Sequence, residues 1–254
     1  MSGTPRLPPA YRLVALERIG STNEEAKRLA AEGAEEGTLV WALEQSAGRG
    51  RRGRSWASPR GNLYLSVVLR PDAPAAEAAQ LGIVAAVALG DALGTLMPPL
   101  TEVRFKWPND VLVNGRKAGG ILIESAASGQ GQLDWLVLGL GVNVESHPEK
   151  TEFPATSLGA EGAAELTAVT LLEAFSRSFL NWTNLWLEEG FAPVRRAWLA
   201  RAWRRGEPIR VRLEGRELEG VFADLDDAGA LLLDLPDGRR RITAADVFAL
   251  PVAV

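Results

Sequence analysis

The sequence predicts an α+β protein with a mixed, largely antiparallel sheet and flanking helices, followed by a small all-β domain. Two observations predict this. Up to Gly206, apolar runs of strand length alternate with segments of helical periodicity. Beyond Gly206, short apolar runs are separated only by turns. Because 254 residues suffice for one large and one small domain, we expect domains at 1–206 and 207–254.

The first predicted element is a helix that starts at Ser21. Ser21-Thr22-Asn23-Glu24-Glu25 offers overlapping capping boxes, and Gly33 is expected to end the helix. Strands are predicted at Thr38–Leu43 and Asn62–Arg70, which are apolar or alternating. The segment between them, Gln45–Gly61, has no periodicity and is predicted to be a loop.

A helix rich in small residues is predicted over Ala75–Leu96, and Pro98-Pro99 ends it. The Asn114-Gly115 pair is a strong hairpin signal in the region that follows. Strands are expected around it and beyond, at Val103–Trp107, Val111–Val113, Lys117–Ser125 and Leu133–Val144. Helical patterns then cover Thr167–Glu189 and Ala192–Arg204.

Five short strands are predicted in the C-terminal segment. They lie at Ile209–Leu213, Glu217–Ala223, Ala230–Asp234, Arg239–Ile242 and Val247–Leu250. Turns that contain glycine separate the first four, which is typical of a small SH3-like β-barrel. No flexible linker precedes this barrel, so we expect the two domains to pack directly against each other.

Composition excludes several classes of site. There is no cysteine, which excludes disulfides, thiolate metal sites and a cysteine nucleophile. The single histidine, His147, argues against a metal site built from several histidines and against most catalytic triads. A net charge of −4 gives no general attraction to nucleic acid. No signal peptide and no uninterrupted apolar run of membrane-spanning length is recognised, so a cytoplasmic protein is expected.

The segment Gln45–Trp56 reads QSAGRGRRGRSW and is rich in arginine and glycine. Between Gln45 and Pro71 there is no acidic residue, although the chain as a whole is acidic. Glycines allow the backbone to approach a ligand closely, and guanidinium groups bind phosphate oxygens in a fork. The alternatives are a solvated basic loop and an RNA-binding segment of the RGG kind. From this segment alone, phosphate binding and these alternatives remain equally open.

A second segment, Phe105–Asp110, reads FKWPND, and KAGGILIE follows it at Lys117–Glu124. Lys106 and Lys117 flank the predicted hairpin, so both can project from neighbouring strands toward one cleft. Gly119-Gly120 removes side chains from a strand, which indicates that another backbone or a ligand lies close. The alternative is a plain turn at Asn109-Asp110 with two exposed lysines.

Asn143 is the polar residue of a third segment, Gly139–Val144, which reads GLGVNV. A buried amide without partners costs about 1–3 kcal/mol, so this side chain is either a structural hydrogen-bonding group or a ligand contact. The residue alone does not decide between the two.

The order of these motifs resembles the biotin protein ligase family. The resemblance covers residues of about 15–250 and rests on GSTN at Gly20–Asn23, GRGRRG at Gly48–Gly53, KWPND, KAGGIL and GVN at Gly141–Asn143. It implies a catalytic domain like that of class II synthetases, with the SH3-like barrel after it. It also implies activation of biotin by ATP to biotinyl-5′-AMP, followed by transfer to a lysine of an acceptor protein.

The resemblance implies roles for individual residues. Biotin contacts are implied for Ser21, Thr22, Asn23, Gln45, Arg49, Gly50, Arg51, Lys117 and Gly120. ATP contacts are implied for Arg49, Arg51, Arg52, Trp56, Lys106, Asn109 and Asn143. Arg51, Lys106 and Lys117 are the candidates for the catalytic step, because two anions must be neutralised and aligned. No protein metal site is expected, since Mg²⁺ would be held mainly by phosphates and water.

The implied partner is the biotin carboxyl carrier domain of a biotin-dependent carboxylase. Only about 18 residues precede the first motif, so we expect the enzyme-only form, without DNA binding or membrane attachment. The resemblance also allows a homodimer. Leu250 stands where family members often have a basic residue, which argues against a nucleotide contact from the last strand. Glu145–Leu166 is expected to be at most an adenine-side loop.

The nearest alternative is a lipoate or octanoate protein ligase of related fold. Those families typically carry a histidine after a glycine-rich stretch, and His147 lies far from the corresponding segment here.

Overall fold

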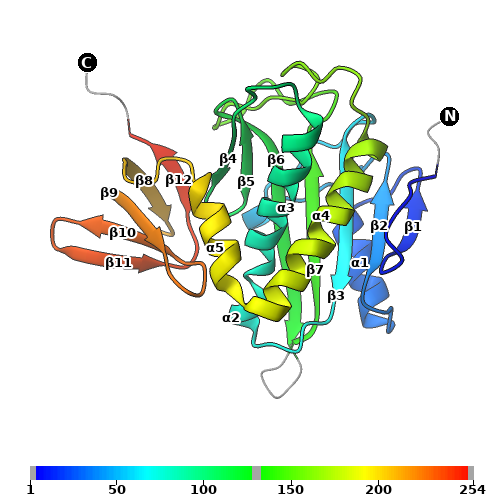
Figure 1. The fold of residues 1–254 in the computed structure, drawn as a ribbon, viewed down its shortest axis with the longest axis horizontal. Coiled ribbons are helices and arrows are strands. Elements are labelled where there is room, and N and C mark those ends of the chain that lie inside the picture. The colour runs from blue at the N-terminus through cyan, green and yellow to red at the C-terminus, as the bar shows by residue number, and fades with distance from the viewer. Residues whose placement is uncertain (1–3, 128–132, 251–254) are drawn as a thin grey trace.

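A computed structural model of the chain describes residues 4–127 and 133–250, and a large seven-stranded sheet dominates it (Figure 1). The strands are β1 (Arg12–Leu16), β2 (Thr38–Ala42), β3 (Leu63–Leu69), β4 (Val103–Lys106), β5 (Asp110–Val113), β6 (Arg116–Ala127) and β7 (Leu133–Val142). Their order is β1-β2-β3-β7-β6-β5-β4, and β1–β2 is the parallel pair among antiparallel neighbours. The mixed, largely antiparallel sheet predicted from the sequence is confirmed.

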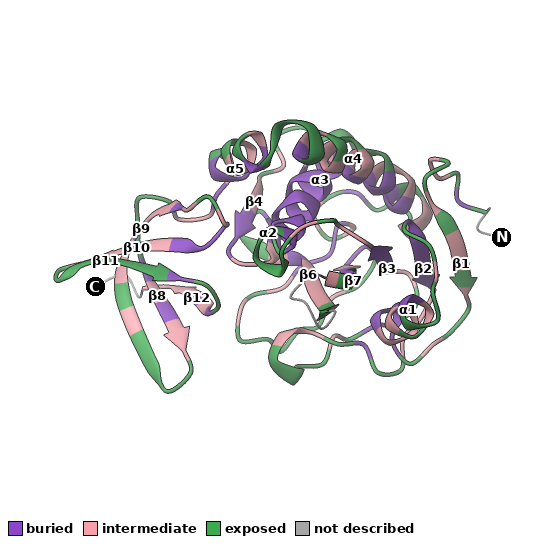
Figure 2. Cartoon of the chain, turned by 90° about the horizontal axis from the view of Figure 1, so that it is seen from below, coloured by how far each residue is buried: buried purple, intermediate pink, exposed green. Residues whose placement is uncertain are grey.

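Helices cover both faces of this sheet. On one face lies α1 (Thr22–Ala31), where Ala26 and Ala30 pack on Val40, Val68 and Val137 of the strands. The larger core is on the other face, where α3 (Leu81–Leu96) lies between the sheet and α4 (Ala168–Glu189) (Figure 2). A further helix, α5 (Phe191–Ala200), follows α4 along the same face (Figure 1).

Four local predictions need correction. The strand β1 was not predicted, because Arg12–Leu16 shows no clear alternation. Ser21 precedes α1 but makes no capping hydrogen bond with its side chain. The helix expected over Ala75–Leu96 is divided into α2 (Ala75–Ala78) and α3, and α5 ends at Ala200.

The backbone stays in the helical region at the junction of α2 and α3, where Gln80 has φ of −60° and ψ of −24°. The Gln80 amide donates to the Asp227 carbonyl at 2.9 Å and accepts from Trp186 Nε1 at 2.7 Å. Backbone bonds from Gln80 to Glu77 tighten the turn there. By length and apolar composition alone the stretch Ala75–Leu96 could cross a membrane, but most of it is buried in the core of this fold.

The C-terminal segment forms a five-stranded antiparallel sheet, as predicted. Its strands are β8 (Pro208–Leu213), β9 (Arg216–Leu225), β10 (Leu231–Leu235), β11 (Gly238–Ile242) and β12 (Asp246–Ala249). The order is β11-β10-β9-β8-β12. In the described part of the chain, the outer strands β11 and β12 do not pair with each other, so backbone hydrogen bonds do not close the sheet into a barrel.

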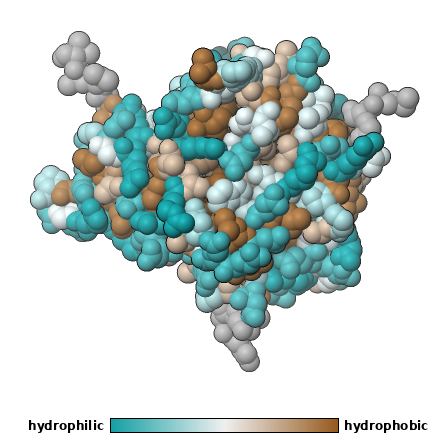
Figure 3. All heavy atoms as spheres, in the orientation of Figure 1, coloured by the Kyte–Doolittle hydropathy of each residue, from teal (hydrophilic) through white to brown (hydrophobic). Residues whose placement is uncertain are grey.

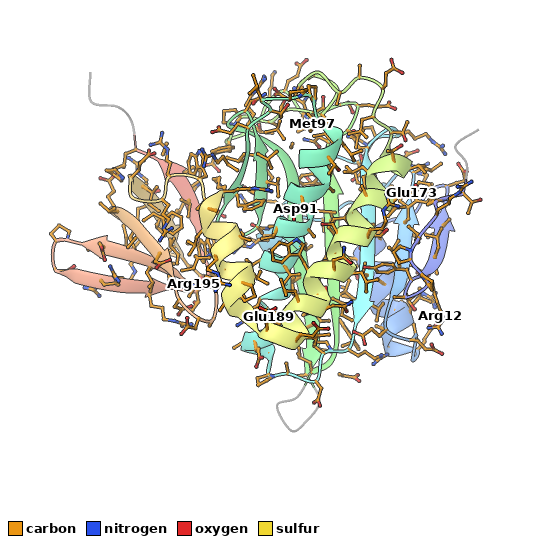
Figure 4. The ribbon with its side chains drawn as sticks, in the orientation of Figure 1. Arg12, Asp91, Met97, Glu173, Glu189 and Arg195 are labelled. Atoms are coloured by element: carbon orange, nitrogen blue, oxygen red, sulfur yellow. The ribbon has the colours of Figure 1, made fainter. Side chains whose placement is uncertain are left out.

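The two sheets are joined by a packed interface. The ring of Trp198 on α5 lies 6.0 Å from that of Phe105 on β4 and 6.3 Å from that of Phe222 on β9. Arg195 of α5 points toward the C-terminal sheet, where it contacts Leu225 and Asp224 (Figure 4). Such contacts agree with the expectation that the domains pack directly. The surface over the helices mixes apolar and hydrophilic residues (Figure 3).

Candidate active site

The site lies on the face of the large sheet that carries α1, where three strands expose small residues. Across β3, β7 and β6, Ser66 pairs with Gly139 and Gly139 with Leu122. A side chain at Gly139 would collide with the Asn23 amide. Glycine is therefore required here because the amide of Asn23 lies directly on the strand.

Gly120 and Gly141 form the next row of this glycine floor and carry the indole of Trp56. A Cβ on Gly120 would lie 3.1 Å from the Trp56 ring, and one on Gly141 would lie 2.7 Å from it. Gly119 faces the opposite way, toward Leu89 of α3. The sequence predicted another backbone or a ligand close to Gly119-Gly120, but the nearest atoms belong to side chains, Trp56 at Gly120 and Leu89 at Gly119.

A hydrogen-bonded network surrounds the first turn of α1. Gln45 Oε1 accepts from the Thr22 backbone amide at 2.8 Å and from the Thr22 hydroxyl at 3.1 Å. Gln45 Nε2 donates to Ser58 at 2.9 Å, and Ser66 lies within hydrogen-bond distance of both Thr22 and Asn23. The side chain of Ser21 lines the pocket beside them. These groups present hydroxyls and amides at one end of the pocket.

The arginine-rich segment folds as a compact loop over the pocket. Gly50 donates to the Arg54 carbonyl at 2.7 Å, and Trp56 donates to the Gly48 carbonyl at 2.9 Å. Arg52 has φ of 54° and Gly53 has φ of 72°, so the chain turns sharply between them. The loop thereby directs successive arginines to different sides.

Acidic partners for these arginines come from distant parts of the chain. Arg49 pairs with Glu24 at 2.8 Å, and Asp246 of β12 pairs with Arg54 at 2.9 Å and Arg52 at 3.3 Å. The lack of acidic residues within the segment therefore does not leave it unpaired. Arg52 faces Asp246 and does not line the pocket, and its contact with the nucleotide stays a prediction.

Arg51 points inward, unlike Arg52. Its Nη1 donates to Asn109 Oδ1 and to the Ala245 carbonyl, each at 3.3 Å. It therefore connects the loop, the β4–β5 turn and the C-terminal domain. Burial lowers the pKa of Arg51 and Asp246 opposes the decrease; a guanidinium stays charged nonetheless.

Lys106 and Lys117 converge on one carboxylate, that of Asp110. Lys106 lies directly opposite Asp110 in the β4–β5 ladder, and its Nζ is 3.3 Å from Oδ2. Lys117 Nζ is 2.6 Å from Oδ1. The lysines do share one cleft, but they are not on neighbouring strands, because β5 lies between β4 and β6.

A β-bulge at Ala118 directs Lys117 into the pocket. Val111 pairs with Gly119 whereas Leu112 pairs with Lys117, so Ala118 is an extra residue in β6. In a regular strand Lys117 would share a face with Gly119. The extra residue moves it to the face of Gly120, where its ammonium also lies 5.2 Å from the Trp56 ring.

Burial and charge act against each other on this cluster. The side chains of Lys106 and Asp110 are only 7% and 12% exposed. Burial lowers the pKa of Lys106, and Asp110 offsets that decrease only in part. Burial alone would raise the pKa of Asp110, but Lys117 and Lys106 outweigh it and hold the pKa below its usual value. The cluster thus holds two ammonium groups around one carboxylate, a net positive charge suited to an anionic ligand.

Together these residues line a cavity of about 290 Å³. Of the site residues predicted from the sequence, all but Arg52 line it: Ser21, Thr22, Asn23, Gln45, Arg49, Gly50, Arg51, Trp56, Lys106, Asn109, Lys117, Gly120 and Asn143. The sequence interpretation missed Asp110, Phe153, Asp246 and Phe248, which line it as well. Asp110 was recognisable within the FKWPND motif, but Phe153 and Phe248 carry no local signal of a site.

Asn143 is a structural hydrogen-bonding group, and the ligand contact that its sequence position also allowed stays a prediction. Its side-chain amide donates to the Thr156 carbonyl at 3.0 Å, a structural bond, and the residue also lines the pocket. The bond holds the segment after β7 in place. From that segment Thr151, Glu152 and Phe153 reach the pocket, so Glu145–Leu166 does form one of its walls.

Residues 53–200 match the family model of the Biotin/lipoate A/B protein ligase family, and this is the class to which the fold and the pocket belong. Residues 206–250 match the Biotin protein ligase C terminal domain. The chain is 46% identical to a biotin–[acetyl-CoA-carboxylase] ligase of Paracoccus denitrificans, over 92% of this chain and 98% of that protein. It is 34% identical to the bifunctional ligase/repressor BirA of Bacillus subtilis, over 92% of this chain and 73% of that protein.

Among solved structures, the biotin protein ligase from Aquifex aeolicus in complex with biotin and ATP superimposes with a TM-score of 0.79. That likeness has 27% identity and covers 93% of this chain and 97% of the other. The chain therefore belongs to the biotin protein ligase family.

Proposed function

We propose that the cavity over the glycine floor binds biotin and ATP and joins them as biotinyl-5′-AMP. The biotin carboxylate attacks the α-phosphorus of ATP; a C–O–P linkage forms, the bond to the β-phosphate breaks, and pyrophosphate leaves. A lysine amine of the acceptor protein then attacks the acyl carbon, and AMP leaves as the amide forms. The protein supplies no nucleophile of its own, so its task is alignment and charge neutralisation.

The observation that carries this proposal is the convergence of Arg51, Lys106 and Lys117 on one cavity with an uncharged end. The hydroxyl and amide groups of Ser21, Thr22, Asn23 and Gln45 suit the ureido ring of biotin. From that end the ligand would extend over Gly120 toward Lys117, where Arg49, Gly50 and Arg51 would cover its carboxylate.

The nucleotide is assigned to the side of the cavity that Lys106, Asn109, Asn143 and Trp56 line. Phe153 and Phe248 lie there too, each with its ring close to Lys106, at 4.7 and 5.7 Å from Nζ. Arg52 is left out of this assignment because it faces Asp246. The presence of Phe248 means that the last strand contributes to the cavity although Leu250 offers no charge.

Magnesium fits this cavity only as a companion of the phosphates. Among the described residues no group of three acidic or histidine side chains is placed to hold a metal ion. The carboxylates of Asp110 and Asp246 already face lysines and arginines. An ATP-bound Mg²⁺ would supply charge neutralisation at the phosphates, with its remaining ligands from water.

The acceptor is proposed to be the biotin carboxyl carrier domain of a carboxylase, in keeping with the acetyl-CoA-carboxylase named for the Paracoccus relative. A cytoplasmic location and action without DNA or membrane remain part of the proposal. The 207–254 domain is proposed as a unit that completes the cavity.

The test is biotin-dependent release of pyrophosphate from ATP, run in parallel with lipoate and with octanoate. The expected result is pyrophosphate release with biotin but not with lipoate or octanoate. The biotin label should then be transferred to a carrier domain. Equal turnover with lipoate would instead favour the related lipoate ligases. The position of His147 already argues against them, because it bonds Ser157 and does not line the cavity.

A further inference from the structure

Glu124 stands behind the pocket and bonds the amide of Asn23. It lies on β6 and does not line the cavity. Its Oε2 accepts from Asn23 Nδ2 at 2.8 Å, and its Oε1 accepts from Lys27 Nζ at 2.7 Å. A carboxylate can only accept hydrogen bonds, so it fixes which end of the Asn23 amide faces it.

The orientation of Asn23 decides where the proton of Ser66 goes. With Nδ2 turned to Glu124, the amide oxygen Oδ1 faces Ser66 Oγ at 2.6 Å. Ser66 is fully buried and has one hydroxyl proton, and an amide oxygen can only accept. The proton of Ser66 is therefore directed to Asn23, away from Thr22, which lies 2.8 Å on its other side.

The direction of the Ser66 proton determines which hydrogen bonds the hydroxyl of Thr22 can make. Its own proton has two acceptors within the protein, Gln45 Oε1 at 3.1 Å and the lone pair of Ser66. Since Ser66 does not donate to it, the lone pairs of Thr22 Oγ1 remain for a ligand. The pocket end thus presents an acceptor at Thr22.

We propose that Glu124 is a positioning residue that sets the direction of the hydrogen bonds from Asn23 through Ser66 to Thr22, so that Thr22 accepts from an N–H group of the biotin ureido ring. This rests on the proposed function. The acyl chains of lipoate and octanoate carry no such N–H, so the same direction of hydrogen bonds favours a cyclic urea over them.

The substitution Glu124→Gln tests the direction with little change of shape. A glutamine can donate to Asn23 Oδ1, which permits the amide to turn. Asn23 Nδ2 would then donate to Ser66, and Ser66 to Thr22, consuming a Thr22 lone pair. We expect the Kd for biotin, measured by calorimetry, to rise by about tenfold or more. The KM for ATP and the melting temperature should stay close to those of the wild type.

The matched control is Lys27→Met, which removes the other partner of Glu124 and leaves the bond to Asn23. Its biotin Kd is expected to stay within about twofold of the wild-type value, as for loss of a partly exposed ion pair. A second readout is the Kd for a biotin that is methylated at a ureido nitrogen. Wild-type protein should discriminate strongly against it, and Glu124→Gln should discriminate less.

A compensating pair gives the decisive test. Asn23→Asp places two carboxylates side by side and should weaken biotin binding. In the double variant Asn23→Asp/Glu124→Gln, the introduced glutamine amide donates to one oxygen of the new carboxylate and Ser66 donates to the other. The original direction and the net charge are both restored, so the double variant should bind biotin more tightly than either single variant.

Two outcomes overturn the proposal: wild-type biotin affinity in Glu124→Gln, or a double variant that binds biotin no more tightly than the better of the two single variants. A protein that releases no pyrophosphate with biotin in its wild-type form would instead refute the proposed function, so the two failures are distinguishable.

Discussion

Asp110 is a counter-ion held between two lysines at the centre of the pocket. In the free protein, Asp110 neutralises part of the positive charge of Lys106 and Lys117, which lie 3.3 and 2.6 Å from it. In the liganded protein, a bound carboxylate and phosphates would neutralise this charge. When an anion binds, each ammonium gains a second negative partner. The same three side chains would therefore serve both the stability of the free protein and the proposed binding of biotin and ATP.

Replacing Asp110 by Asn should destabilise the free protein more than the liganded one. The uncompensated lysines repel each other in a mostly buried place, a loss of up to about 3–5 kcal/mol when one member of a buried pair is removed. Biotin and a non-hydrolysable ATP analogue should restore part of the melting temperature. Asp134→Asn, which removes an exposed carboxylate 3.6 Å from Arg70, serves as the control and should melt as the wild type does. An unchanged melt for Asp110→Asn would refute the counter-ion role.

Lys117 is expected to act in the chemical step. Its ammonium would pair with the biotin carboxylate and then with the charge that develops on the acyl phosphate. Lys117→Ala should slow biotin-dependent pyrophosphate release by about 30–1,000-fold, or about 2–4 kcal/mol. Lys117→Arg should recover little, because a planar guanidinium fork does not occupy the space of a compact ammonium. Near-normal turnover in a well-folded Lys117→Ala protein would remove this lysine from the mechanism.

The arginine-rich loop and β6 determine how the site is assembled. The sequence was sufficient to identify the loop, since glycine and arginine content is a local property, but it did not single out Arg54, which also lines the cavity. It was not sufficient to separate Arg51 from Arg52, because a left-handed turn at Arg52 sends the two in opposite directions. The partner that draws Arg52 away, Asp246, lies in another domain and has no local signature.

The strand pattern had a similar limit. Most strands of the large sheet could be predicted from their apolar residues, but β1 was missed because only its pairing with β2 makes it a strand. The division of Ala75–Leu96 was missed as well, since the backbone stays helical there and only a tighter turn at Gln80 separates α2 from α3. The tertiary partner β2, not local propensity, determines β1.

The loop Gln45–Trp56 should be protected from trypsin by ligand. Its arginines are held by ion pairs that are mostly exposed and hence weak, so the free loop is expected to open readily. Biotin with ATP should lower the cleavage rate by adding charge-assisted hydrogen bonds. Asp246→Ala should raise cleavage in the free protein, because Arg52 and Arg54 then lose their partner. Equal rates with and without ligands would contradict this expectation.

At the scale of the whole molecule, the cavity belongs to both domains. Arg51 reaches the Ala245 carbonyl, and Asp246 and Phe248 line the cavity from β12. The interface behind it is apolar, with Trp198 between Phe105 and Phe222. The C-terminal sheet thus lines the candidate active site and is held against it by core packing.

This interface should make the two domains unfold together. Calorimetry of the wild type is expected to give one cooperative transition. Trp198 is almost fully buried, at 1% exposure, and Trp198→Ala should cost about 3–5 kcal/mol. It should also uncouple the transition of the C-terminal sheet from that of the larger domain. Two separate transitions already in the wild type would show that the interface does not couple them.

The bulge at Ala118 has a consequence for how this strand tolerates change over evolution. It shifts the alternation of side chains along β6 by one residue. Before the bulge Lys117 faces the pocket, and after it Ile121 faces the core. Deletion of one residue there would move the Lys117 side chain to the opposite face of the strand. The pairing of the apolar stretch after the bulge would stay the same. A one-residue insertion or deletion at Ala118 is therefore expected to remove Lys117 from the pocket, while the pairing of the residues after the bulge, Gly120 among them, is kept.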